Sequence, residues 1–202
     1  MTAKPKTKTL ILDVAEQAVL EKGFEATSIE EIVVALDISR SGFFYHFKDK
    51  NELARAMIER YIDNENTLFD DLFARARELD SDPLHAMLIG LKLLAELLDD
   101  MPNGHPGCVI AAAAYQDRLF DKGVRDMNRQ AILGWRHRFR AMFEEIAAQY
   151  PPKVETDLDA LGDMVSGVIE GGLILQRALG ENTAPAAQIM QFRQYVRLLF
   201  TP

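Results

Sequence analysis

Apolar residues along most of this chain recur every three or four positions, the spacing that places them on one face of an α-helix. One clear example runs from Thr9 to Lys22, and Gly23 then ends the pattern. No stretch shows the two-residue alternation of a convincing strand. The pattern therefore predicts an all-α protein of about nine helices.

Caps and helix breakers set the expected boundaries. Ser, Thr, Asp and Pro satisfy or replace the first N–H groups of a helix, whereas Gly and Pro commonly end one. The helices predicted in this way span approximately residues 9–22, 28–36, 39–47, 50–79, 83–100, 108–120, 122–150, 157–179 and 186–200. The strongest loop signal is residues 101–107, which contain two prolines and two glycines.

Residues 27–50 predict two short helices joined by a tight turn. Ser28 can cap the first helix, and Glu31 can reach back to it as a capping box. Ser39 can cap the second helix, while Asp37 tolerates a turn conformation between them. Two crossed helices with so short a connection describe a helix-turn-helix.

The second helix of this pair has an unusual outward surface. Phe43 and Phe47 lie four residues apart and are expected to pack on the first helix. The other face carries donors, aromatic rings and a glycine that lets a backbone approach closely: Arg40, Ser41, Gly42, Phe44, Tyr45, His46 and Lys48. Arg reads guanine edges, and Tyr, Ser, His and Lys bind phosphates, so this surface suits a DNA groove.

The residues around this surface form a specific pattern: Thr27-Ser28-Ile29, Ile32, Ser39-Arg40 and Phe43-Phe44-Tyr45-His46-Phe47-Lys48-Asp49-Lys50, followed by Glu52-Leu53. In this pattern the chain resembles the TetR (tetracycline-repressor) family of transcriptional regulators. The resemblance implies a three-helix DNA-binding domain at residues 1–50 and a helical ligand-binding and dimerisation domain at 51–202. It also implies DNA-facing residues: Ser28, Arg40, Ser41, Tyr45, His46, Lys48, Phe44 and Lys50.

Three departures from the family pattern leave the operator sequence open. Asp37 stands where the family usually has Gly in the turn, and the Gly expected at 41 appears as Gly42. Glu30 stands where some members place a basic residue near the groove.

Charge is divided unevenly along the chain. The 202 residues carry a net charge of −8, which by itself argues against nucleic acid. Residues 1–60 hold nine basic and ten acidic side chains and contribute only −1, so the other −7 lies beyond them. Residues 1–6 are expected to form a basic arm, either simply disordered or in contact with a minor groove or phosphates.

The cysteine count and the hydropathy of the chain indicate the cellular compartment in which the protein is expected. A single cysteine excludes an intrachain disulfide, and no signal segment or membrane-length apolar run is present. We therefore expect the protein to lie in a reducing cytoplasm and not in a membrane.

Candidate chemistry is sparse. Cys108 follows His105 by three residues, but the other histidines lie on separate predicted helices, and a zinc site needs three or four ligands. Cys108 is then a small buried residue or, at a helix start, a reactive thiol. No phosphate loop or catalytic motif appears, so we expect neither an enzyme nor a metal or cofactor.

Two further sets of residues follow from helical spacing together with the family resemblance. Candidates for lining a small-molecule pocket, which could equally be ordinary core, are Leu91, Leu94, Met101, Cys108, Tyr115, Trp135, Phe139 and Met142. Glycines inside a helix cost about 1 kcal/mol each, a loss that close helix packing can offset. A dimer interface, or tight packing within one chain, is therefore expected at Gly167, Val168, Gly171, Leu175, Ile189, Phe192, Val196 and Leu199.

Together these features predict a homodimeric transcriptional regulator. It would act as a repressor on double-stranded DNA with a palindromic operator, and an unknown small-molecule effector would release it. The alternative is a small-molecule-binding or interaction protein whose helix-turn-helix does not read DNA.

Overall fold

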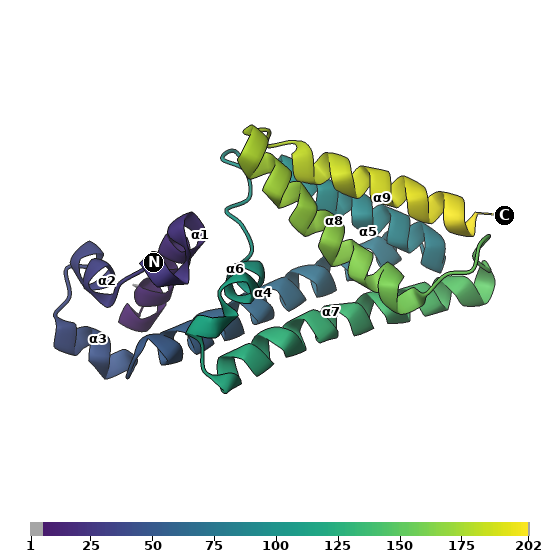
Figure 1. Ribbon diagram of the computed structural model, residues 1–202. Coiled ribbons are helices and arrows are strands. Elements are labelled where there is room, and N and C mark those ends of the chain that lie inside the picture. Colours follow the sequence, from purple (N-terminus) through teal and green to yellow (C-terminus); the bar gives the residue numbers. More distant parts are fainter. Residues whose placement is uncertain (1–5, 202) are drawn as a thin grey trace. The chain divides into compact units, whose positions relative to one another are not determined.

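The computed structural model describes residues 6–201, and most of them are helical (Figure 1). Within that range the chain forms nine α-helices and a short 3-10 helix, with no strand, so the predicted all-α class is confirmed. The α-helices are α1 (Thr7–Ala26), α2 (Ile29–Ala35), α3 (Arg40–His46), α4 (Lys50–Leu79), α5 (Pro83–Asp99), α6 (Val109–Tyr115), α7 (Lys122–Gln149), α8 (Leu158–Leu179) and α9 (Ala184–Phe200). None of these helices is long and apolar enough to cross a bilayer.

Side-chain caps begin three of the longer helices where the sequence predicted them. Asp49, Asp82 and Asp157 each accept a hydrogen bond, at 2.9 Å, from a backbone N–H in the first turn of α4, α5 or α8. Gly180 ends α8 in the left-handed conformation, with φ 70°. Local sequence therefore fixes where these helices start and stop.

The chain divides into two compact units. The first comprises residues up to Asn64 together with Pro106–Ala131, and the second comprises Glu65–His105 and residues from Ile132 onward. The first unit thus extends beyond the residues 1–50 expected from the sequence. Helices α4 and α7, which no proline interrupts, contribute residues to both units.

Aromatic packing and ion pairs hold the first unit together. The rings of Phe24 and Phe120 meet edge to face, with centroids 4.6 Å apart. Arg60 of α4 bridges to Asp13 at 2.6 Å and to Glu16 at 2.8 Å, both on α1. Helix α1 is thereby fixed against α4 by charge.

A glutamine joins α6 to α1 inside the same unit. Gly23 interrupts α1 with a φ of 84°, and the side-chain carbonyl of Gln116 accepts the N–H of Phe24 at 2.8 Å. The backbone of Gln116 leaves the helical region, and a 3-10 helix, Asp117–Leu119, follows. The prediction of one continuous helix over 108–120 is therefore wrong, because α6 ends at Tyr115.

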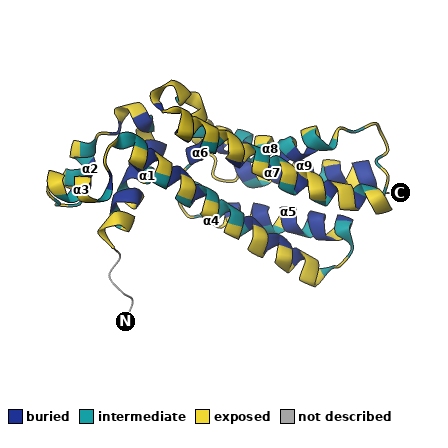
Figure 2. Ribbon diagram, turned by 90° about the horizontal axis from the view of Figure 1, so that it is seen from below, coloured by how far each residue is buried: buried dark blue, intermediate teal, exposed yellow. Residues whose placement is uncertain are grey.

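The second unit is a helical bundle in which α9 packs against both α5 and α8 (Figure 1). Buried residues occupy more than one side of α5, which Figure 2 shows in dark blue. Phe143 and Phe200 stack with ring centroids 6.2 Å apart, and Phe69 meets Phe139 edge to face at 5.4 Å. Aromatic side chains thus fill much of this core.

Glycines allow helix backbones to approach closely at two points in the second unit. A Cβ added to Gly172 of α8 would lie 2.6 Å from the Cα of Pro185 in α9. One added to Gly162 would lie 3.0 Å from the carbonyl oxygen of Arg136 in α7. Any larger residue would force the helices apart, which explains why α8 accommodates these glycines despite their low helix propensity.

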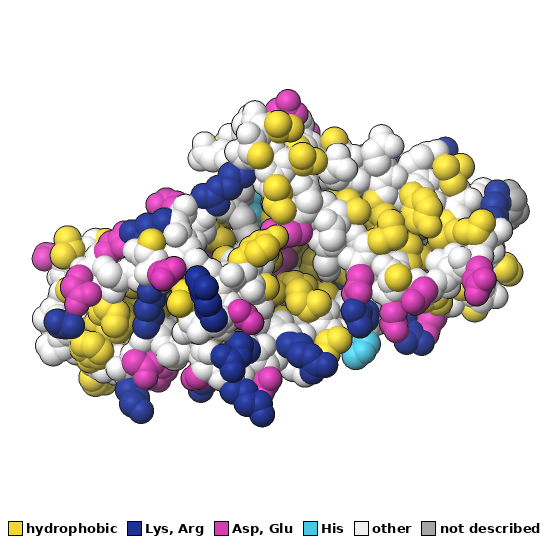
Figure 3. Space-filling view, in the orientation of Figure 1, with side chains coloured by type: hydrophobic (Ala, Val, Ile, Leu, Met, Phe, Trp, Pro, Cys, Tyr) yellow, Lys and Arg dark blue, Asp and Glu magenta, His cyan; other side chains and the backbone are white. Residues whose placement is uncertain are grey.

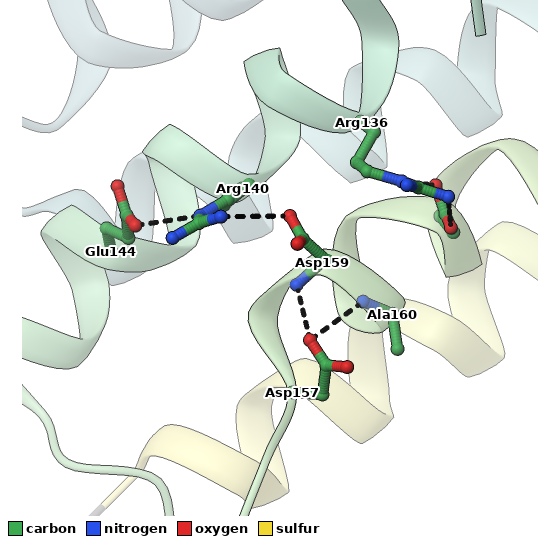
Figure 4. A network of polar contacts seen from close by, with 7 residues as sticks. Arg136, Arg140, Glu144, Asp157, Asp159 and Ala160 are labelled. Atoms are coloured by element: carbon green, nitrogen blue, oxygen red, sulfur yellow. Dashed lines mark hydrogen bonds and ion pairs between the residues drawn. The ribbon is translucent and has the colours of Figure 1, made fainter. Parts of the chain in front are cut away.

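A polar network joins α7 to α8 on the surface of this unit (Figure 4). Arg136 forms two hydrogen bonds with the carboxylate of Asp163, at 2.8 and 2.6 Å. Arg140 contacts Glu144 at 2.8 Å and Asp159 at 3.2 Å. These arginines therefore have internal partners.

We expect Gly172→Ala to lower the free energy of unfolding by about 1–3 kcal/mol, because its methyl group would overlap the Pro185 backbone. Urea denaturation measures the change. Gly134→Ala is the control, since a Cβ there meets no atom within 4 Å and should stabilise α7 by up to about 1 kcal/mol. Equal effects of the two substitutions would contradict the packing described here.

Candidate nucleic-acid interface

Two serines define the starts of α2 and α3. The hydroxyl of Ser28 accepts the N–H of Glu31 at 3.2 Å, and that of Ser39 accepts the N–H of Gly42 at 3.0 Å. Both predicted caps are confirmed. The reciprocal half of the capping box is not formed, because the carboxylate of Glu31 instead binds Lys22 of α1 at 2.6 Å.

The turn between these helices depends on Asp37. Its φ is 50°, and no other residue except glycine has a positive φ between residues 6 and 201. Asp tolerates this left-handed conformation because its short polar side chain can bond locally. The turn therefore forms without the glycine that the family pattern usually has.

Helix α3 buries one face and exposes the other. Phe43 and Phe47 are 0% and 1% exposed, as their spacing predicted. On the opposite face Tyr45 is 85% and Phe44 43% exposed. Arg40 is also largely exposed, so arginine and aromatic side chains remain available on this surface.

The other predicted DNA-facing residues vary in exposure. Ser28, Ser41 and Lys48 are exposed, and His46 is half-buried with its ring 5.0 Å from that of Tyr45. Gly42 is also half-buried, and a Cβ there would lie 3.3 Å from the hydroxyl of Ser39. The absence of a side chain at Gly42 thus leaves room for the Ser39 cap, in addition to allowing DNA to approach closely.

Lys50 was predicted to face DNA, but the structure places its side chain elsewhere. Its ammonium group donates to the backbone carbonyl of Phe24 and lies 3.5 Å from that of Glu25. Burial lowers the pKa of Lys50, and the nearby Glu25 carboxylate partly opposes that shift. Lys50 therefore satisfies carbonyl groups at the end of α1 and is not free to contact phosphate.

Sequence reasoning missed the partner of Arg40. A carboxylate oxygen of Glu30 in α2 lies 3.0 Å from its guanidinium group, which also lies 5.9 Å from the centre of the Phe44 ring. The ten-residue separation of Glu30 and Arg40 gave no local signal, because the pair forms only when α2 and α3 cross.

The predicted basic arm lies mostly outside the described residues. Only Lys6 of that segment is described, and it is exposed. Lys8, in the first turn of α1, places its ammonium group 5.5 Å from the centre of the Phe47 ring.

The eight predicted pocket residues divide between the two units: Leu91, Leu94, Met101, Trp135, Phe139 and Met142 lie in the second, and Cys108 and Tyr115 in the first. Tyr115 is 79% exposed, so the structure gives its place in a pocket no support. Cys108 is half-buried and caps α6, its sulfur accepting the N–H of Ala111 at 3.4 Å. No described group of His, Cys, Asp or Glu residues is arranged to hold a metal ion.

The predicted dimer residues also separate into two sets. Ile189, Phe192, Val196 and Leu199 are at most 4% exposed and already fill the core of their own protomer, so assigning them to a dimer surface is wrong. Gly167 and Leu175 are exposed, Val168 and Gly171 are half-buried, and a Cβ on either glycine meets nothing within 4 Å.

Other apolar residues of α8 and α9 are exposed although the sequence analysis did not select them: Met164, Ile174, Leu179, Met190 and Leu198. Figure 3 shows hydrophobic side chains gathered over these two helices. The signal was present in α8, since Met164, Gly167, Gly171 and Ile174 continue one helical stripe.

Comparison with known proteins agrees with this geometry. Residues 11–57 match the family described as bacterial regulatory proteins, tetR family. The chain is 33% identical over 91 residues to the uncharacterized HTH-type transcriptional regulator YvkB of Bacillus subtilis, a match covering 45% of each chain. It is 25% identical over 178 residues to YxaF of the same organism, covering 87% of each.

The fold is similar to that of solved structures as well. A TetR-family regulator from Agrobacterium tumefaciens superposes with a TM-score of 0.78 at 19% identity, over 96% of this chain and 97% of that one. At that identity the superposition establishes a shared fold.

A capped helix pair with a tight turn and an exposed arginine and aromatic face is a helix-turn-helix, the DNA-binding motif of many transcriptional regulators. Residues 11–57, which contain this helix pair, match the tetR family of bacterial regulatory proteins, and the described chain shares the fold of TetR-family structures.

The position of Lys50 can be tested by stability. We expect Lys50→Met to lower the free energy of unfolding by about 1 kcal/mol, since the carbonyl of Phe24 would lose a charged donor. The control Lys48→Met should change it by less than about 0.5 kcal/mol, because that side chain is exposed. Urea denaturation measures both changes. A larger loss of stability for Lys48→Met than for Lys50→Met would contradict the structural role of Lys50.

Proposed function

We propose that this protein is a homodimeric repressor that binds a palindromic operator and is released when a small molecule binds its second unit. The observation that carries the proposal is the outward face of α3, with Arg40 and Tyr45 exposed on a helix-turn-helix. Arg can bond to both acceptors on a guanine edge, and Tyr and Lys can bond to phosphates.

Two-fold symmetry compensates for the small size of the reading helix. Helix α3 has only seven residues and by itself can contact few base pairs. A dimer would place two such helices in successive major grooves, about 34–36 Å apart. The exposed apolar residues of α8 and α9, together with the open space beside Gly167 and Gly171, support these helices as the dimer surface.

A buried group without a partner supports ligand binding in the second unit. Trp135 is 7% exposed, and its indole nitrogen has no hydrogen-bond partner among the described residues. A buried N–H left unbonded costs about 1–3 kcal/mol, which an acceptor on a ligand would recover. Coupling between effector and operator of about 1–3 kcal/mol is the usual scale for such switches.

The alternative is a small-molecule-binding protein whose helix-turn-helix does not read DNA. The net charge of −8 and the carboxylate of Glu30 beside Arg40 favour it. Binding to one selected palindrome that weakens steeply with salt would distinguish a DNA-reading protein from this alternative.

Two substitutions on α3 test the DNA surface, using a palindromic probe selected from random double-stranded DNA with the wild-type protein. We expect Tyr45→Ala to weaken binding by about tenfold through lost phosphate contact. Lys48→Ala should also weaken it and reduce the salt slope by about one. Gel shift and fluorescence anisotropy across a salt series measure both effects.

Lys92→Ala is the matched control, since it removes a positive charge from α5, where Lys92 pairs with Glu96. Its operator affinity should equal that of the wild type. All variants should remain dimers by sedimentation. Unchanged binding by both α3 variants would refute the assignment of this surface.

The dimer surface has its own test in Gly171→Leu. A Cβ at this position meets no atom of the protomer within 4 Å, so we expect stability to be kept while close approach of a second copy is blocked. We expect the dissociation constant of the dimer to rise at least about tenfold, the equivalent of 1.4 kcal/mol. Sedimentation equilibrium measures it, with Gly134→Leu as the control, and an undiminished dimer would exclude this face of α8.

A further inference from the structure

We propose that Glu30 is a positioning residue that sets sequence specificity by directing Arg40 toward a base edge and away from phosphate. The inference rests on the proposed function, because it assumes that α3 enters a DNA groove. It adds a role for a residue of α2 that the motif itself did not mark as DNA-facing.

The geometry holds Arg40 from two sides. Glu30 reaches across from α2 to place a carboxylate oxygen 3.0 Å from a terminal guanidinium nitrogen, and the Phe44 ring lies 5.9 Å from the guanidinium carbon. The side chains of Arg40 and Glu30 remain 69% and 62% exposed. The pair therefore lies on the solvent side of the helix-turn-helix, where a partner can reach it.

The chemistry of the pair favours bases over phosphates. A guanidinium group has five N–H donors, so one that binds Glu30 keeps donors for the two acceptors of a guanine edge. The carboxylate repels a phosphate that approaches the same guanidinium group, and it offsets the positive charge that would otherwise attract any DNA. Arg40 then contributes little to binding of unrelated sequences.

The neighbouring residue supplies a matched comparison. Glu31 carries the same charge on the same helix, but its carboxylate binds Lys22 of α1 at 2.6 Å. Replacing either glutamate by glutamine removes one negative charge from α2. Only Glu30→Gln removes the carboxylate that is paired with Arg40.

The experiment selects binding sites from random double-stranded DNA with the wild type, Glu30→Gln, Glu31→Gln, Glu30→Asp and Arg40→Ala. Arg40→Ala identifies the half-site position that Arg40 reads, as the position where the guanine preference disappears. The wild type should prefer guanine there by about tenfold or more. Glu30→Gln should reduce that preference to below about threefold, since the unrestrained guanidinium can turn to phosphate.

Two further readouts separate positioning from a general loss of structure. Glu30→Gln should bind unrelated DNA more tightly and show a salt slope steeper by about one per protomer. Glu30→Asp keeps a carboxylate and should retain part of the guanine preference, whereas Glu31→Gln should keep all of it.

Three outcomes would overturn the inference. In the first, Glu30→Gln keeps the wild-type preference at the position that Arg40 reads. In the second, Glu30→Gln and Glu31→Gln alter it equally. In the third, Arg40→Ala removes no preference. A wild-type protein that enriches no sequence would instead refute the proposed function, and this inference with it.

Discussion

A helix of seven residues is too short to be stable alone in water, so α3 depends on the burial of Phe43 and Phe47. Their complete burial fixes the rotation of the helix about its axis. That rotation turns Tyr45 and Phe44 outward, and the cap from Ser39 sets where the helix begins. The surface that would meet DNA is therefore a consequence of the core beneath it.

Several basic side chains of the first unit are paired with other groups of the same chain. Lys22 binds Glu31, Lys50 bonds to backbone carbonyls of α1, and Arg60 bridges Asp13 and Glu16. A count of basic residues consequently overstates the positive charge available to DNA. The exposed cations on or beside α3 are few, and one of them, Arg40, is already paired. Discrimination between sequences then depends on how each remaining cation is oriented, more than on net charge.

Glycines in α8 serve opposite purposes on its two sides. Gly162 and Gly172 allow α7 and α9 to pack closely, which stabilises the protomer. Gly167 and Gly171 face open space and contribute nothing to that packing. No packing contact within the protomer offsets their low helix propensity, which is why we propose this face of α8 as the dimer surface.

The sequence by itself determined most of the helices and their caps, the turn at Asp37 and the inward side of α3, because these depend on residues within a few positions of one another. Only the tertiary structure decided that Lys50 points to α1, that Glu30 pairs with Arg40, and that Phe192 lies in the core while Met190 lies outside. Helical spacing selects an apolar face but does not say which neighbour covers it. The crossing of helices distant in sequence settles that question, since it alone brings such residues within contact distance.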